Sequence, residues 1–333
     1  MKLILLAVLI AALAGPIGLP AQAQGVPDFR ALIDTENVME HIRVLSVEIG
    51  ARLYGTEAEA QAAKYIHDQL AGWGYQVETQ PFDTKLAPCG ADAEVVTSQN
   101  VIASRPGDEQ VIVIGAHLDS YGDGTGAGAN ASGVAALLAA AEALRDLEPQ
   151  HTLVFVAFGA NEGGCPTGAD YYVYSLGDQI RSVTAMLNVD AVGIGTQLYA
   201  YAGARIEWGA DPYDPPRIWR GGPIWVRELL RGIAGEMGIP VGQSPRATWR
   251  GYTGLWSDHA PFVEVGIPVA YLEAWNWETG DPWWGMETAS GDVMHTSGDV
   301  FEHIRAENVE MAAEVLAATV YRLGTADLNT LRY

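Results

Sequence analysis

The sequence predicts an α/β fold in which a mostly parallel central sheet carries helices on both faces. Short apolar runs rich in β-branched residues alternate along the chain with longer segments of helical periodicity, and this alternation is typical of parallel sheets. The chain has 333 residues, of which 49% are apolar, which is enough for one large domain. Because we find no repeats and no long low-complexity linker, we expect a single domain over residues 24–333.

The individual elements follow from the spacing of the apolar residues. Apolar side chains at helical spacing, such as Ala63, Ile66 and Leu70, predict the helices. We expect helices over residues 34–49, 57–72, 132–146, 168–176, 223–237 and 306–323. We expect strands over residues 75–82, 100–103, 111–115, 152–158, 183–189 and 268–272. The stretch 201–222 is rich in Pro, Gly and Trp, and we expect it to be a long loop over the site.

The first residues have the pattern of a signal peptide over residues 1–23. Lys2 precedes an apolar run, Leu3 to Leu13, and Ala21-Gln22-Ala23 gives the small-x-small pattern of a cleavage site. The apolar run is short for a membrane span, although an uncleaved anchor is the alternative. We therefore expect a secreted or periplasmic protein that begins near Gln24, with no membrane span after cleavage.

Charge and cysteine content restrict the partners and the compartment. The formal net charge is -22, with 41 acidic and 19 basic residues. This balance argues against a nucleic-acid partner, because phosphate binding needs clustered Lys and Arg. The two cysteines, Cys89 and Cys165, can pair in an exported protein or remain as two thiols, and the sequence leaves both alternatives open.

Candidate metal ligands follow three of the expected strands. His117, Glu162 and Asp190 come within four residues of the ends of the runs 111–115, 152–158 and 183–189, and His295 lies in a later loop. Ligands bind beyond the carboxyl ends of parallel strands, and His, Glu and Asp side chains are the ligands of zinc. Each residue alone could be a structural hydrogen-bonding group, but their shared position favours a metal site. Asp119 is two residues from His117 and is expected to orient its imidazole with its carboxylate.

These residues fall within a longer series of motifs. The series comprises His41-Ile42-Arg43-Val44-Leu45, Ala51-Arg52, Gly55-Thr56-Glu57, Gln99-Asn100-Val101, His117-Leu118-Asp119-Ser120, Asn130-Ala131-Ser132-Gly133, Ser257-Asp258-His259 and His295-Thr296-Ser297-Gly298-Asp299. In these motifs and their order the sequence resembles metallopeptidase family 28, of the di-zinc aminopeptidase type. The resemblance covers most of the mature chain and implies a zinc-exopeptidase, phosphorylase/hydrolase-like fold.

The resemblance also implies roles for single residues. One zinc ion would be held by His117 and Asp190 and a second by Glu162 and His295, with Asp258 and His259 supporting the ligands. The family places a bridging Asp where this chain has Ala129, while Asp123 lies six residues too early in a gapless alignment. The general-base Glu of the family is replaced by Asn161, whose amide cannot accept the proton.

Three functions are compatible with this pattern. The first is a zinc aminopeptidase that acts on peptide or protein substrates and is weakened by Ala129 and Asn161. The second is a non-catalytic member of the family that binds a peptide or protein. The third is an acyl-transfer enzyme similar to glutaminyl cyclase, which the Asn at position 161 disfavours because that branch also needs an acid there. The two substitutions leave the number of zinc ions at one or two, with two disfavoured.

Overall fold

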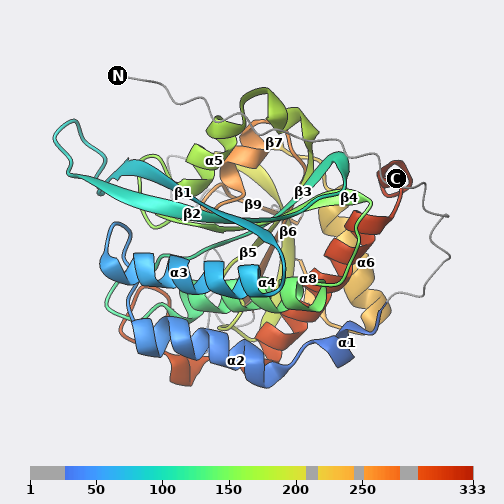
Figure 1. Cartoon of the computed structure of the whole chain (residues 1–333), viewed down its shortest axis with the longest axis horizontal. Helices are drawn as coiled ribbons and strands as arrows, with labels where there is room; N and C mark the ends of the chain where they lie inside the picture. Colours follow the sequence, from blue (N-terminus) through green and yellow to red (C-terminus); the bar gives the residue numbers. More distant parts are fainter. Residues whose placement is uncertain (1–26, 208–216, 244–250, 278–291, 333) are drawn as a thin grey trace.

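All strands among the described residues belong to one mixed sheet (Figure 1). The structure is a computed structural model that describes residues 27–207, 217–243, 251–277 and 292–332, without the side chains of 206–207 and 217–220. The strands are β1 (Gln76–Lys85), β2 (Val95–Arg105), β3 (Asp108–His117), β4 (His151–Phe158), β5 (Val183–Val189), β6 (Gln197–Glu207), β7 (Arg217–Gly221), β8 (Val241–Gly242), β9 (Tyr252–Thr253) and β10 (Val269–Trp275).

The centre of the sheet is parallel and its edges are antiparallel. The strand order is β1-β2-β4-β3-β5-β10-β6-β7, and β8 and β9 pair with β6. Strands β4, β3, β5 and β10 run parallel to one another, whereas β1, β2, β6 and β7 are joined by antiparallel pairings. The carboxyl ends of β3, β4 and β5 therefore meet at one edge of the sheet, as the sequence predicts.

Helices cover both faces of this sheet. The α-helices are α1 (Phe29–Leu32), α2 (Thr35–Arg43), α3 (Glu57–Gly72), α4 (Gly133–Ala143), α5 (Gly168–Leu176), α6 (Trp225–Met237), α7 (Ala260–Glu264) and α8 (Ala306–Thr325). The larger core packs α2, α3, α4, α6 and α8 against one face, and the smaller core packs α5 and α7 against the other (Figure 1). Helix α4 is apolar almost all round because it lies between the sheet and the outer helices.

Most of the expected elements are confirmed, with boundaries shifted by a few residues. The helix expected over 34–49 ends as an α-helix at Arg43 and continues as a π-helical turn, Val44–Ile49. The expectation of a loop over 201–222 is wrong, because β6 and β7 occupy its two ends and pair with each other. Residues 208–216 lie outside the described residues, as does the expected signal peptide.

The structure also decides between the two alternatives for the cysteines. Cys89 and Cys165 form a disulfide, with a Cα–Cα distance of 6.1 Å across 76 residues of sequence. Cys89 lies in the connection between β1 and β2, and Cys165 lies in the turn that follows β4. The disulfide therefore links the β1–β2 hairpin to the segment that carries Asn161 and Glu162.

Candidate metal centre

The four residues expected to bind metal lie together at the carboxyl edge of the sheet. The Nε2 atom of His117, at the end of β3, lies 3.4 Å from Oδ1 of Asp190, which follows β5. The same nitrogen lies 4.0 Å from Oε1 of Glu162, in the turn after β4. His295 completes the group from its separate loop, because its Nε2 atom lies 3.1 Å from Oε1 of Glu162.

The donor atoms are of the kinds that zinc binds, and three of the separations between them are close to those of a zinc site. Zinc takes imidazole and carboxylate ligands at about 2.0–2.2 Å in a tetrahedron, which separates neighbouring donor atoms by about 3.3 Å. The measured separations of 3.1 to 4.0 Å bracket this value. Within the described ranges no three His, Cys, Asp or Glu side chains already converge on one point suited to a metal ion. The side chains must therefore rotate slightly to share an ion.

Contacts within this group of side chains shift the pKa values of His117, Asp190 and His295. Burial lowers the pKa of the His117 imidazole, but Asp190 and Asp119 outweigh it and hold this pKa well above its usual value. The hydrogen bond to Glu162 likewise raises the pKa of His295. Burial raises the pKa of Asp190, but His117 and two hydroxyl groups leave it below its usual value. A metal cation would compete with protons for these imidazole nitrogens.

Two hydroxyl groups that sequence reasoning missed position Asp190. The Tyr271 hydroxyl, from β10, donates to Oδ2 of Asp190 at 3.2 Å. The Ser257 hydroxyl also hydrogen bonds to Asp190 and accepts a hydrogen bond from the Asn188 amide at 2.8 Å. Ser257 could have been found, because it opens the Ser257-Asp258-His259 motif, whereas nothing in the sequence marks Tyr271.

Asp119 lies beside His117 but contacts it differently from the expectation. The nearest acceptor to Nδ1 of His117 is the backbone carbonyl of Asp119 at 3.1 Å, and the carboxylate is 3.4 Å away. The carboxylate accepts the backbone N–H groups of Asn161 at 3.1 Å and Glu162 at 2.9 Å. The side chain of Asp119 therefore holds the turn that carries Glu162, and its backbone orients the imidazole.

Ala129 offers only a methyl group at the position where the family resemblance places a bridging Asp. It is buried, and its N–H donates to Oδ2 of Asp299 at 3.2 Å, while the N–H of Gly128 donates to Oδ1 at 2.5 Å. The carboxylate that approaches Ala129 is therefore Asp299, with both oxygens bonded to the backbone. Asp123 is exposed. Sequence reasoning gave Asp299 no role, although it closes the motif that begins at His295.

The two residues expected to support the ligands, Asp258 and His259, are both buried. Neither carboxylate oxygen of Asp258 has a hydrogen-bond partner in the part of the chain that the structure describes, and burial raises its pKa well above its usual value. His259 donates from Nε2 to the Gly254 carbonyl at 2.7 Å, and burial lowers its pKa to about 4. Its ring packs on that of Tyr271, with centroids 4.8 Å apart, which links it to the group that positions Asp190.

Glu59 is a buried carboxylate that hydrogen bonds to the backbone just after the end of β4. Its Oε2 atom accepts the Gly55 N–H at 2.7 Å, and its Oε1 atom accepts the Ser98 hydroxyl at 2.5 Å. It also accepts a backbone hydrogen bond from Ala160, directly before Asn161. Burial is the largest influence and raises the pKa of Glu59 from 4.5 to about 7, although these hydrogen bonds oppose it.

This shift predicts a specific pH dependence of stability. Because the folded pKa is raised, the contribution of Glu59 is complete below about pH 4.5 and is lost as the pH rises through 7. Relative to Glu59→Gln, the wild-type protein should lose about 3 kcal/mol of unfolding free energy between these pH values. Urea unfolding across this range measures it, with the exposed Glu57→Gln as control. Parallel profiles for wild type and Glu59→Gln would contradict the prediction.

An α/β sheet whose parallel strands bring His, Glu and Asp side chains to one edge is compatible with a metallopeptidase of the zinc aminopeptidase type. The model of Peptidase family M28 matches residues 100–320, and the chain belongs to this family. The family is one of peptidases, so peptides are its substrate class. No helix of the described residues is long and apolar enough to cross a membrane.

Particular proteins resemble the chain over most of its length. It is 27% identical over 297 residues to the alkaline phosphatase isozyme conversion protein of Escherichia coli, covering 81% of each chain. It is 28% identical over 329 residues to leupeptin-inactivating enzyme 1 of Streptomyces exfoliatus, covering 94% of this chain and 66% of that protein. The zinc aminopeptidase BSAP from Bacillus subtilis shares the fold, with a TM-score of 0.68 at 20% identity over 91% of this chain and 97% of that one.

Proposed function

We propose that this chain is an exported metallopeptidase homologue that holds one zinc ion and hydrolyses N-terminal peptide bonds slowly. One observation carries the proposal: His117, Glu162, Asp190 and His295 lie together, while the neighbouring positions 129 and 161 supply no carboxylate. Four ligands suffice for one zinc ion, which would still take a substrate oxygen by expanding to five-coordination, but two ions sharing them would have only two protein ligands each. The missing bridge also removes the negative charge that would offset the repulsion between two neighbouring dications.

Some residues of the site would hold the zinc ion, and others orient the ligands. His117 and Asp190 would hold the ion from one side, and Glu162 and His295 from the other. Zinc bound there supplies Lewis acidity toward the peptide carbonyl. Asp119 fixes the Glu162 turn through its two backbone bonds. Position 161 offers an amide, which cannot take up a proton, and the loss of a general base lowers a rate by about 10²–10⁴.

The same two substitutions favour a second candidate function. Without bridge and base, the fold would still present an edge with metal ligands at which a peptide can bind. A non-catalytic peptide-binding or protein-binding domain of this family is therefore the alternative. Both candidate functions predict that the protein binds zinc, but only the first predicts that it hydrolyses peptides.

Metal content measured together with hydrolysis tests the proposal. Purified mature protein should retain at most one zinc ion per chain after dialysis, and His117→Ala or Glu162→Ala should abolish its binding. Asp123→Ala, which removes an exposed acid, serves as the control and should keep the zinc. A panel of aminoacyl anilides should be cleaved slowly and only by the zinc-loaded protein. Two tightly held zinc ions would refute the single-ion site, and full zinc occupancy without any turnover would establish the second candidate.

Export is proposed from the first 23 residues and is supported by the disulfide. Disulfides form and persist mainly in oxidising compartments outside the cytosol. Amino-terminal sequencing of protein from the source cell should therefore begin at or near Gln24. Recovery of protein with an intact Met1 from the cytosol would refute export.

A further inference from the structure

The turn that carries Glu162 has no regular structure of its own. It comprises residues 159–167, between the end of β4 at Phe158 and the start of α5 at Gly168. Two of its residues have positive φ angles, 54° at Ala160 and 109° at Gly163. A turn of this kind is not held by a helix or a strand ladder, so the position of Glu162 depends on the contacts that its neighbours make.

One set of contacts holds the turn from the side of the metal ligands. The Asp119 carboxylate accepts the N–H groups of Asn161 and Glu162, as described above. Within the turn, the Gly164 N–H donates to the Ala160 carbonyl at 3.1 Å. These bonds fix the first half of the turn relative to β3.

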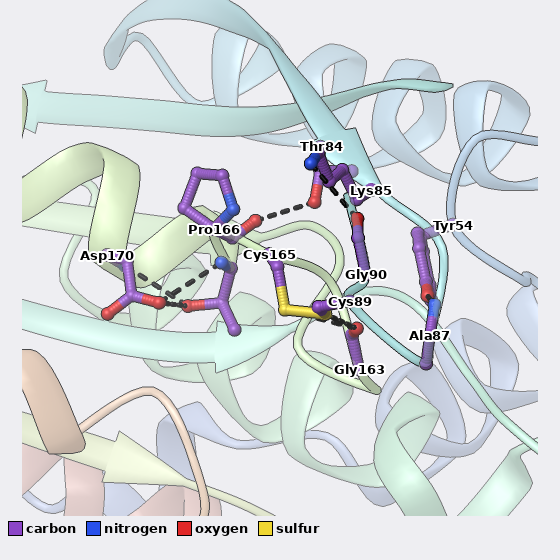
Figure 2. The surroundings of a disulfide bond; sticks show 11 residues. Tyr54, Thr84, Lys85, Ala87, Cys89, Gly90, Gly163, Cys165, Pro166 and Asp170 are labelled. Carbon is purple, nitrogen blue, oxygen red and sulfur yellow. Dashed lines mark hydrogen bonds between the residues drawn. A yellow bond between two sulfur atoms is a disulfide. The ribbon is translucent and has the colours of Figure 1, made fainter. Parts of the chain in front are cut away.

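The disulfide holds the second half of the turn (Figure 2). Cys165 is three residues beyond Glu162 and is bonded to Cys89, whose sulfur also lies 3.5 Å from the Gly163 carbonyl oxygen. The Lys85 N–H donates to the Cys165 carbonyl at 3.2 Å, and the Thr84 hydroxyl donates to the Pro166 carbonyl at 2.7 Å.

The segment that contains Cys89 is itself anchored to the body of the protein. The Ala87 N–H donates to the hydroxyl of Tyr54 at 3.0 Å (Figure 2). Tyr54 is buried in a cluster with Phe82 and Ala160. The disulfide therefore links the turn to a segment that is itself hydrogen bonded to the buried Tyr54. Both cysteines are exposed, so a dissolved reductant can reach the sulfurs.

We propose that the Cys89–Cys165 disulfide positions Glu162 for metal binding and makes the metal affinity of the site sensitive to reduction. The proposal rests on the proposed zinc site. Reduction by a thiol or a phosphine breaks the S–S bond, and each sulfur takes one electron and one proton to become a thiol. A dithiol is oxidised to its own disulfide, and a phosphine takes an oxygen atom from water. Backbone partners that orient metal ligands contribute about 10–100-fold to metal affinity, and the disulfide should contribute in this range.

The experiment compares oxidised and reduced full-length mature protein in two measurements. The first is hydrogen exchange of residues 159–167 in metal-free protein, where reduction by a water-soluble phosphine should speed exchange while amides of β3 and β5 keep theirs. The second is zinc affinity by competition with a chelator, where reduction should raise the dissociation constant by about 10–100-fold. The double variant Cys89→Ser plus Cys165→Ser should reproduce the reduced protein and should not respond to the phosphine.

A matched variant separates local positioning from a general loss of stability. His151 begins β4 at the other end of the strand, where it hydrogen bonds to Asp108 and to the Ala326 carbonyl. His151→Ala should destabilise the fold but leave exchange in residues 159–167 and zinc affinity unchanged.

The outcomes distinguish this inference from the proposed function. Unchanged exchange of residues 159–167 after reduction would overturn the positioning role, whatever the metal result. Faster exchange with unchanged zinc affinity would overturn the link to the metal. Oxidised protein that binds no zinc would overturn both that link and the proposed function, while the exchange measurement would still decide whether the disulfide holds the turn. Tighter zinc binding on reduction, lost in the double serine variant, would show that the freed thiolates act as ligands and would also overturn the inference.

Discussion

Restoring the two missing acids should restore two-zinc binding and raise aminopeptidase turnover by at least about 10²-fold, the low end of what a general base contributes. The change is Ala129→Asp together with Asn161→Glu. The resemblance places the bridge at position 129 and the base at position 161, and Asn161 directly precedes the candidate ligand Glu162. Each single change should do much less, because bridge and base act on the same step and such residues are not additive.

A matched control isolates the base from the bridge. Ala129→Asp combined with Asn161→Gln has a side chain of the length of Glu at position 161 but no carboxylate, so it should recover the second zinc without the rate. Zinc is counted by elemental analysis after dialysis, and turnover is measured on aminoacyl anilides. Brisk turnover by the wild-type protein would show that the positions are misaligned. A double mutant that holds two zinc ions and remains inert would show that the site has been remodelled for binding.

Replacing Arg52 by Met should destabilise the protein by about 3–5 kcal/mol, the loss expected when a buried charged group is removed from its partners. The side chain is fully buried, and its guanidinium donates to five backbone carbonyls at 2.7 to 2.9 Å. These carbonyls belong to Leu45, Gly50, Leu118, Thr125 and Gly126. Met fills similar space but satisfies none of them, so the segment between His117 and Ala129 would lose its common anchor.

The control for this change is Arg43→Met on the neighbouring helix. Arg43 is partly exposed and pairs with Glu40 and Glu48, and exposed pairs contribute about 0–1 kcal/mol. Urea unfolding of both variants compares the two losses directly. Burial lowers the pKa of Arg52 to about 10, so the guanidinium stays charged near neutral pH and the contrast should hold there. A loss below about 1 kcal/mol for Arg52→Met would contradict the structural role.

The metal-ligand candidates and the central strands could be predicted because their signals are local. The apolar runs that precede His117, Glu162 and Asp190 mark buried parallel strands, and parallel strands bring their carboxyl ends to one edge. The two departures from the family pattern, Ala129 and Asn161, are likewise visible from single positions. Their consequence for chemistry follows from the side chains alone, since a methyl group and an amide cannot act as acids.

The supporting contacts could not be predicted, because they join residues that are distant in sequence. The Arg52 guanidinium donates to the carbonyls of Thr125 and Gly126. The Asp119 carboxylate accepts the backbone N–H groups of Asn161 and Glu162. The Tyr271 hydroxyl donates to the Asp190 carboxylate. Strand β6 was not predicted for a related reason. Its Gly and aromatic residues are typical of loop sequences, but pairing with β10 and β7 stabilises it as a strand.

The sequence by itself thus determined the fold class and the absence of acids at positions 129 and 161, and it predicted the candidate ligands. The tertiary structure decided that Cys89 and Cys165 pair, that Asp119 holds the Glu162 turn, and that Asp299 approaches Ala129. The physical reason is that strand and helix formation depends on periodic patterns within short windows, whereas a disulfide or a buried polar contact depends on the distance between segments. That distance is fixed only when the whole sheet has assembled.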